Sequence, residues 1–124
     1  MIIYSPKNIE PKKVDYLMSQ IDVAPTILGL LNISYNSRFF GFDIFQASET
    51  QRRVFISTYQ LLGYLKEDDL VVLAPQQKTS FYKVDLATKK AISGASKNDT
   101  ALIEAISWYE TASYAFKNKL NHLE

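Results

Sequence analysis

The segment SQIDVAPTILGLL, residues 19–31, combines an acid, a proline and a run of aliphatic residues in an order that favours a helix. We interpret Asp22 as the N-cap, because its carboxylate can accept hydrogen bonds from free N–H groups of the first turn. Pro25 then takes the third helical position, where its missing N–H removes no intrahelical bond. In the alternative, Ser19 is the cap and Asp22 closes a capping box, but Pro25 would then cost a hydrogen bond in the second turn.

The helix expected from Asp22 to Leu31 has one apolar face. Its members recur at spacings of three and four, which predicts packing against a core: they are Val23, Ile27, Leu30 and Leu31. Upstream, Ile2, Ile3 and Tyr4 form a short β-prone run that ends at Ser5-Pro6. Such a short strand is not stable alone, so we expect it to join a larger sheet, with a polar linker at residues 7–17 leading to the helix.

Downstream of residue 46 the pattern changes to short strands. We expect four strands at residues 53–58, 60–67, 69–75 and 80–86, separated by turn-like sequences such as Glu67-Asp68-Asp69. The short connections favour antiparallel neighbours. Gly63 lies inside the second run and could mark a bulge.

A long helix is expected at the C-terminal end, after a polar loop at residues 93–98. Asn98 or Asp99 can cap it, and the sequence is free of Gly and Pro as far as about Leu120. Its apolar stripe consists of Leu102, Ala105, Ile106, Tyr109, Ala112, Phe116 and Leu120. We expect this amphipathic helix to pack on the sheet.

The composition excludes several classes of function. The chain has 124 residues, of which 47% are hydrophobic and 22% charged, and it has no run of about 18 apolar residues that would predict a membrane helix. Fourteen basic and thirteen acidic residues are spread without a basic stripe, so no nucleic-acid partner is expected. The absence of cysteine excludes disulfides and thiolate metal sites. The first residues lack the features of a signal peptide.

The residues offer few candidates for chemistry. The only histidine, His122, is three residues from the end, and its nearest acidic companion is Glu124. The Glu67-Asp68-Asp69 triplet lacks the glycine of a calcium loop and is interpreted as a polar turn. A set of aromatic side chains could form a glycan or lipid platform, although helical spacing favours a core role: Trp108, Tyr109, Tyr114 and Phe116. We therefore expect no catalytic, cofactor-binding or metal-binding residue in this chain.

The opening segment resembles a motif of the sulfatases and their relatives, S-x-x-D-[IV]-x-P-T-[IL]-L, which follows their last metal-binding motif. The continuation FFGFDIF, residues 39–45, resembles the branch that contains lipoteichoic acid synthase and related phosphoglycerol or phosphoethanolamine transferases. YQLLGYLKEDDLVVLAP and AISWYETASYAFKN, residues 59–75 and 105–118, are also similar to that branch. The four elements occur in the family order and together cover most of the chain.

The resemblance implies where the chemistry of such a protein lies. The family uses a threonine or modified cysteine as nucleophile and holds a divalent metal with acidic residues and a late Asp-His pair. All of these precede the matched segments, so none transfers to this chain, and Asp22 is expected to be a helix cap rather than a ligand. The divalent metal is expected in the intact parent, which would be extracytoplasmic and anchored in the membrane through upstream segments.

The expected fold class is α+β. Residues 1–46 would supply the final strand and helix of an alkaline-phosphatase-like α/β domain, and residues 47–124 an antiparallel sheet of about four strands with one long C-terminal helix. The first functional hypothesis is the C-terminal, non-catalytic part of a sulfatase-like transferase or hydrolase, whose partner is the remainder of the catalytic domain. The second is a free-standing binding module for a glycan, lipid headgroup or protein. In the isolated chain, residues 1–46 are expected either to be held in a homodimer or exchanged arrangement, or to be more mobile than the part from Arg53 onward.

Overall fold

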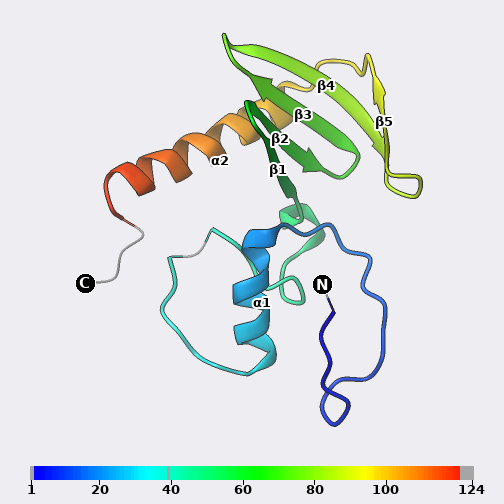
Figure 1. Cartoon of the computed structure of the whole chain (residues 1–124), viewed down its shortest axis with the longest axis vertical. Helices are drawn as coiled ribbons and strands as arrows, with labels where there is room; N and C mark the ends of the chain where they lie inside the picture. The colour runs from blue at the N-terminus through cyan, green and yellow to red at the C-terminus, as the bar shows by residue number, and fades with distance from the viewer. Residues whose placement is uncertain (1, 39, 121–124) are drawn as a thin grey trace.

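The computed structural model describes residues 2–38 and 40–120 (Figure 1). The N-terminal third contains a 3-10 turn, η1 (Gln20–Asp22), and one short helix, α1 (Val23–Leu30). A second 3-10 turn, η2 (Glu49–Gln51), leads to the sheet. The sheet and the long helix follow as β1 (Val54–Thr58), β2 (Leu61–Lys66), β3 (Asp69–Ala74), β4 (Lys78–Asp85), β5 (Lys90–Ser93) and α2 (Asp99–Lys117).

The five strands form an antiparallel meander in the order β1-β2-β3-β4-β5. The α+β fold class with a long C-terminal helix is therefore confirmed, and the sheet has one strand more than expected. The extra strand, β5, pairs with β4 through residues such as Ile92, opposite Lys83. Its four residues contain a single β-branched side chain, which leaves almost no local strand signal.

Gly63, which could have marked a bulge, lies in a regular ladder. Gly63 pairs with Ile56 on one side and with Val72 on the other, and the register of both ladders is continuous. Instead, the Tyr109 hydroxyl of α2 donates a hydrogen bond of 2.8 Å to the Gly63 carbonyl. The glycine thus marks a contact between sheet and helix.

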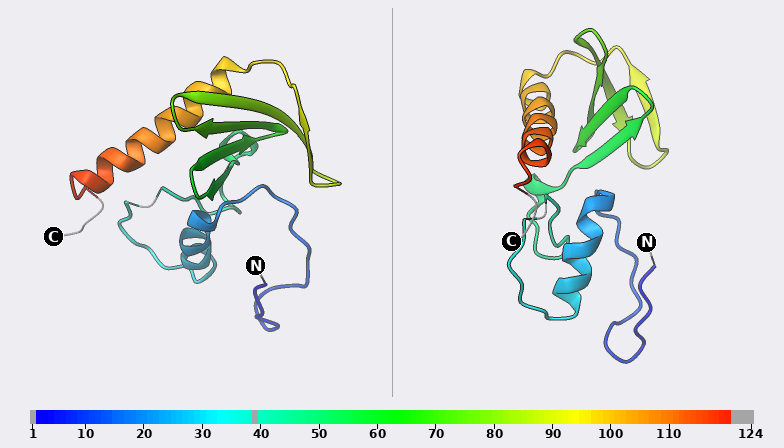
Figure 2. Two further views of the ribbon diagram at one scale, coloured as in Figure 1. Left: turned by 45° about the horizontal axis from the view of Figure 1, so that its top comes forward. Right: turned by 60° about the vertical axis from the view of Figure 1, so that its left-hand side comes forward.

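The core lies between α2 and one face of the sheet (Figure 2). Its buried members are Tyr64, Val71, Ala101 and Ala105, and the partly buried side chains around them are Phe55, Leu73, Phe81, Leu102 and Trp108. The predicted stripe on α2 is correct near the sheet, but Ile106, Phe116 and Leu120 are exposed. The second half of α2 extends past the strands, so it has no sheet to cover it (Figure 1).

The start of α1 differs in its capping from the expectation. The helix begins at Val23 and Pro25 is its third residue, as predicted. However, the Asp22 side chain does not cap α1; Ser19 is the N-cap of η1, and the Ser19 N–H donates to Asp22 Oδ2 at 2.7 Å, which closes the capping box. The 3-10 turn resolves the conflict with Pro25, because it places the capping box one turn ahead of the α-helix.

The apolar face of α1 is also not buried as expected. The helix buries Pro25 and Thr26, whereas Ile27, Leu30 and Leu31 are exposed. Residues 2–4 form no strand within the described chain, and Ile2 is 94% exposed. Both features place apolar side chains of the N-terminal third in solvent.

Candidate functional site

Four polar residues are buried where α1 begins and β1 starts: Ser19, Asp22, Thr26 and Arg53, which we call the Asp22–Arg53 cluster. Asp22 is only 1% and Arg53 only 3% exposed. Burying charged groups is costly unless they are paired and hydrogen-bonded. The burial of these four polar residues therefore indicates a functional or structural role for the cluster.

The Asp22 carboxylate is surrounded by N–H donors. Arg53 Nη1 lies 3.0 Å from both carboxylate oxygens. Backbone N–H groups of Ser19 and Phe42 donate to the same carboxylate at 2.7 and 2.9 Å. The carboxylate is thereby satisfied entirely by groups of its own chain.

Arg53 is held by contacts on its edge and on its faces. Its Nη2 donates to the Phe40 carbonyl at 3.0 Å. The guanidinium lies 4.5 Å from the ring centroid of Phe42 and 5.2 Å from those of Phe55 and Trp108. Cation–π attraction of this kind is strongest for desolvated cations. Arg53 consequently joins α2, β1 and the segment around residue 40 at one point.

The two hydroxyl groups of the cluster complete these links. Ser19 Oγ accepts from the Phe55 N–H of β1 at 2.8 Å. Thr26 Oγ1 donates to the Asp22 carbonyl at 2.6 Å and accepts from the Ile44 N–H at 3.2 Å. Through these bonds Ser19, Asp22 and Thr26 connect the opening segment to β1 and to residues 40–44. No pattern in the sequence indicated Arg53 as their partner, because it lies 31 positions from Asp22.

Gly41 allows the chain to approach the cluster. A Cβ at Gly41 would overlap the carbonyl oxygen of Ile21, a backbone atom that has little freedom to move. The residue is therefore required by a close crossing of two backbone segments. The crossing brings residues 40–44 against the start of α1.

A second polar network joins β2 to α2. Lys66 Nζ donates to both oxygens of Glu104 at 2.7 and 2.9 Å, and the Tyr64 hydroxyl donates to Glu104 Oε2 at 2.8 Å. Burial alone would raise the pKa of Glu104, but the hydrogen bonds from Lys66 and Tyr64 outweigh it and lower that pKa. Burial, together with the hydrogen bond to Glu104, raises the pKa of Tyr64. The network is a structural contact between sheet and helix.

The acidic triplet is a polar turn, as interpreted. Glu67 has φ of 54°, and Lys83 Nζ lies 2.8 Å from Asp68 Oδ1 and 2.9 Å from Asp69 Oδ1. The hydrogen bond from Lys83 lowers the pKa of Asp68. Within residues 2–38 and 40–120, no three side chains of His, Cys, Asp or Glu are grouped to hold a metal ion. His122 and Glu124 lie outside the described residues.

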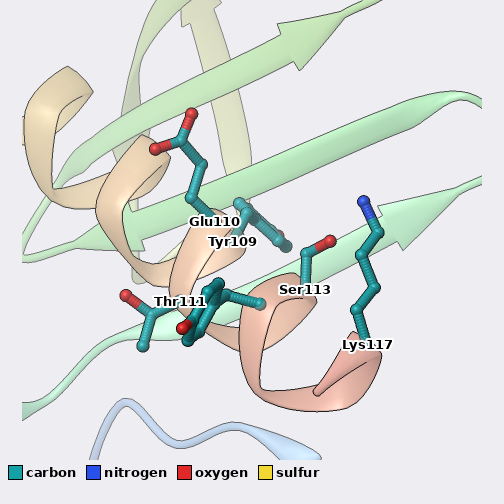
Figure 3. Close-up of a pocket in the computed structure, with 6 residues that line it drawn as sticks. Tyr109, Glu110, Thr111, Ser113 and Lys117 are labelled. Atoms are coloured by element: carbon teal, nitrogen blue, oxygen red, sulfur yellow. The ribbon is translucent and has the colours of Figure 1, made fainter.

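The aromatic residues of α2 divide between core and surface. Trp108 and Tyr109 pack against Phe55, with ring centroids 5.4 and 5.7 Å apart. Tyr114 and Phe116 are exposed. An open hollow of about 620 Å³ lies along this part of α2 (Figure 3); its lining is Tyr109, Glu110, Thr111, Ser113, Tyr114 and Lys117.

None of the helices in the described part of the chain has the length and hydrophobicity required to span a membrane.

Comparison with known proteins gives one informative likeness. No family model matches the sequence. A solved structure from Vibrio parahaemolyticus, described as a protein in the alkaline phosphatase superfamily, superimposes with a TM-score of 0.86 at 25% sequence identity. The likeness covers 94% of this chain but spans only 29% of that protein. It supports a relationship between this chain and the alkaline phosphatase superfamily.

Proposed function

We propose that this chain is the non-catalytic C-terminal structural part of a sulfatase-like, metal-dependent transferase or hydrolase that acts on phosphate or sulfate esters. The observation that carries the proposal is the likeness over 94% of the chain to a part, 29%, of an alkaline phosphatase superfamily protein. The preferred reaction of the parent is phosphoglycerol-type transfer at the cell envelope, which rests on the sequence motifs of residues 19–31 and 39–45.

The Asp22–Arg53 cluster supports a scaffold role. Its carboxylate, guanidinium and hydroxyl groups bond to backbone and side chains of α1, β1 and residues 40–44. A catalytic carboxylate or hydroxyl needs a free edge that faces a substrate or a metal, and Asp22 and Thr26 are 1% and 0% exposed. In the proposed parent, the nucleophile and the divalent metal belong to other parts of the polypeptide.

A binding module remains the second candidate, and one observation favours it. Tyr114 is exposed and lines the hollow on α2 together with Glu110 and Lys117, and Phe116 of the same helix is also exposed. Exposed aromatic rings with polar neighbours are suited to sugar or headgroup contacts. Titration of the chain with glycans and lipid vesicles, with Tyr114→Ala as the comparison, tests this candidate.

The proposed function is tested by comparing the 124-residue chain with the product of the complete reading frame that contains it. Both are assayed with divalent metals on an aryl phosphate, an aryl sulfate and a phosphatidylglycerol analogue. We expect metal-dependent turnover by the longer protein and none by the 124 residues. Turnover by the pure 124-residue chain that persists after repurification would contradict the proposal.

A further inference from the structure

The chain exposes more surface than a compact protein of its size. Its accessible surface is 9653 Å² at a mass of 14.2 kDa. A compact folded monomer of this mass exposes about 6,800 Å². The excess is roughly 2,900 Å², whereas one partner of a standard-size interface buries about 800 Å². The fold therefore has surface that is suited to a permanent partner.

Part of the exposed surface is the apolar side of α1. Its exposed aliphatic side chains continue into the residues that follow the helix; we call Ile27, Leu30, Leu31 and Ile33 the α1 ridge. Charged residues are absent from positions 23–37. Depletion of charge distinguishes the cores of stable interfaces from ordinary surface.

Hydrogen bonds near both ends of α1 set the position of the α1 ridge. Thr26, one of the two buried residues of the helix, bonds through its Oγ1 to the Asp22 carbonyl and to the Ile44 N–H. At the C-terminal end, Asn32 has φ of 52°, its N–H donates to the Gly29 carbonyl, and the Ile33 N–H donates to the Leu28 carbonyl at 3.1 Å. This Schellman motif fixes Ile33 beside the last turn. The helix thus buries Pro25 and Thr26 and presents Ile27, Leu30 and Leu31 outward.

We propose that the α1 ridge packs against the remainder of the same polypeptide, an apolar surface of the larger alkaline-phosphatase-like domain. This inference rests on the proposed function. The similar protein from Vibrio parahaemolyticus carries the matching region as 29% of one chain, so most of that chain is available to cover such a ridge. A second copy of this chain is the alternative occupant, and the experiment separates the two.

The test uses a ridge variant, Ile27→Gln with Leu31→Gln, and a matched control, Ile92→Gln with Ile103→Gln. The control residues are also exposed aliphatic side chains but lie on β5 and the outer side of α2. Each pair is introduced into the 124-residue chain and into the product of the complete reading frame. The readouts are the urea midpoint, oligomeric state by light scattering, and amide exchange over residues 23–33.

In the short chain, we expect neither variant to move the urea midpoint, because all four side chains are already exposed. In the longer protein, we expect the amides of α1 to exchange at least about tenfold more slowly than in the short chain. We expect the ridge variant to lose folded yield by about tenfold or more, as for polar groups placed in a core, while the control retains it.

Each contrary result has a distinct meaning. A ridge variant of the longer protein that folds and exchanges like the control would overturn the inference alone, with metal-dependent turnover still supporting the proposed function. A longer protein without turnover whose ridge variant nevertheless fails to fold would overturn the proposed function and leave the interface standing. A reading frame of these 124 residues alone, or a longer protein in which the ridge is protected only on dimerisation, would overturn the inference in favour of the second copy.

Discussion

The ion pair of Asp22 and Arg53 is buried, and Arg53 Nη1 alone contacts both carboxylate oxygens, so the two partners depend on each other. We expect Asp22→Asn to lower the free energy of unfolding by about 3–5 kcal/mol, because it leaves the Arg53 guanidinium buried without a counter-charge. Urea denaturation measures the loss. Asp15→Asn is the control, since Asp15 pairs with Lys13 on the surface, and a loss below about 1 kcal/mol is expected there.

The double variant Asp22→Leu with Arg53→Met separates charge from packing. It removes both charges together, so we expect it to be more stable than Asp22→Asn. An Asp22→Asn protein as stable as the Asp15→Asn control would show that the cluster does not hold the N-terminal third to the sheet.

The glycines at 29 and 41 provide a second comparison at the residue scale. A Cβ at Gly41 overlaps the Ile21 backbone, whereas a Cβ at Gly29 meets only the Asp43 side chain, which can move. We expect Gly41→Ala to cost about 1–3 kcal/mol and Gly29→Ala much less, because alanine also favours the helix by about 1 kcal/mol. Thermal unfolding ranks the two, and a reversed order would contradict the backbone crossing at Gly41.

Among the elements, α2 is attached to the sheet by Glu104, whose pKa is lowered in the folded protein. A lowered folded pKa means that the stabilisation is present above the unfolded pKa and is lost as pH falls through the folded pKa. We therefore expect the stability difference between the native chain and Glu104→Gln to be largest near neutral pH. This stability difference should shrink as the pH falls below 4.5, the ordinary pKa of a glutamate side chain. Urea midpoints of both proteins, measured between pH 3 and 7 at steps on the order of one pH unit, would detect this trend. A stability difference between the two proteins that is constant with pH would contradict it.

The hydrogen bond from Tyr109 to the Gly63 carbonyl joins the same two elements further along. We expect Tyr109→Phe to lower the free energy of unfolding by about 0.5–1.5 kcal/mol, since the phenyl ring keeps its packing and only the hydrogen bond is lost. Tyr114→Phe is the matched control, because Tyr114 is 63% exposed. Equal effects of the two substitutions would show that the hydrogen bond from Tyr109 to Gly63 does not stabilise the packing of α2 on the sheet.

For the whole molecule, the two ends of the chain have unequal cores. Residues 2–19 contain no helix or strand, whereas the sheet and α2 enclose Tyr64, Val71 and Ala105. We expect residues 1–46 of the 124-residue chain to be more mobile than the part from Arg53 onward, or to be held in a homodimer. Hydrogen exchange and light scattering are the measurements. A monomer whose amides at Ile2, Ile27 and Leu30 are as protected as those at Val72 and Ile106 would favour the free-standing module.

Local signals in the sequence were sufficient for much of this architecture. The cap at Asn98 accepts from the Ala101 N–H at 3.0 Å as its position predicted, and four of the five strands follow from β-branched runs and turn residues. These features depend on neighbours a few positions apart. The division at residue 46 stays a prediction.

Only the tertiary structure decided how the opening segment is used. The sequence predicted that Ser19, Asp22 and Thr26 belong to a helix and its cap. Their hydrogen-bond partners Phe55, Arg53 and Ile44, however, lie 36, 31 and 18 positions away. The bond between Thr26 and Ile44 holds Thr26 inward, while Ile27, Leu30 and Leu31 are left exposed. Periodicity in a sequence identifies an apolar face of a helix, but which face is buried depends on what the rest of the chain places beside it.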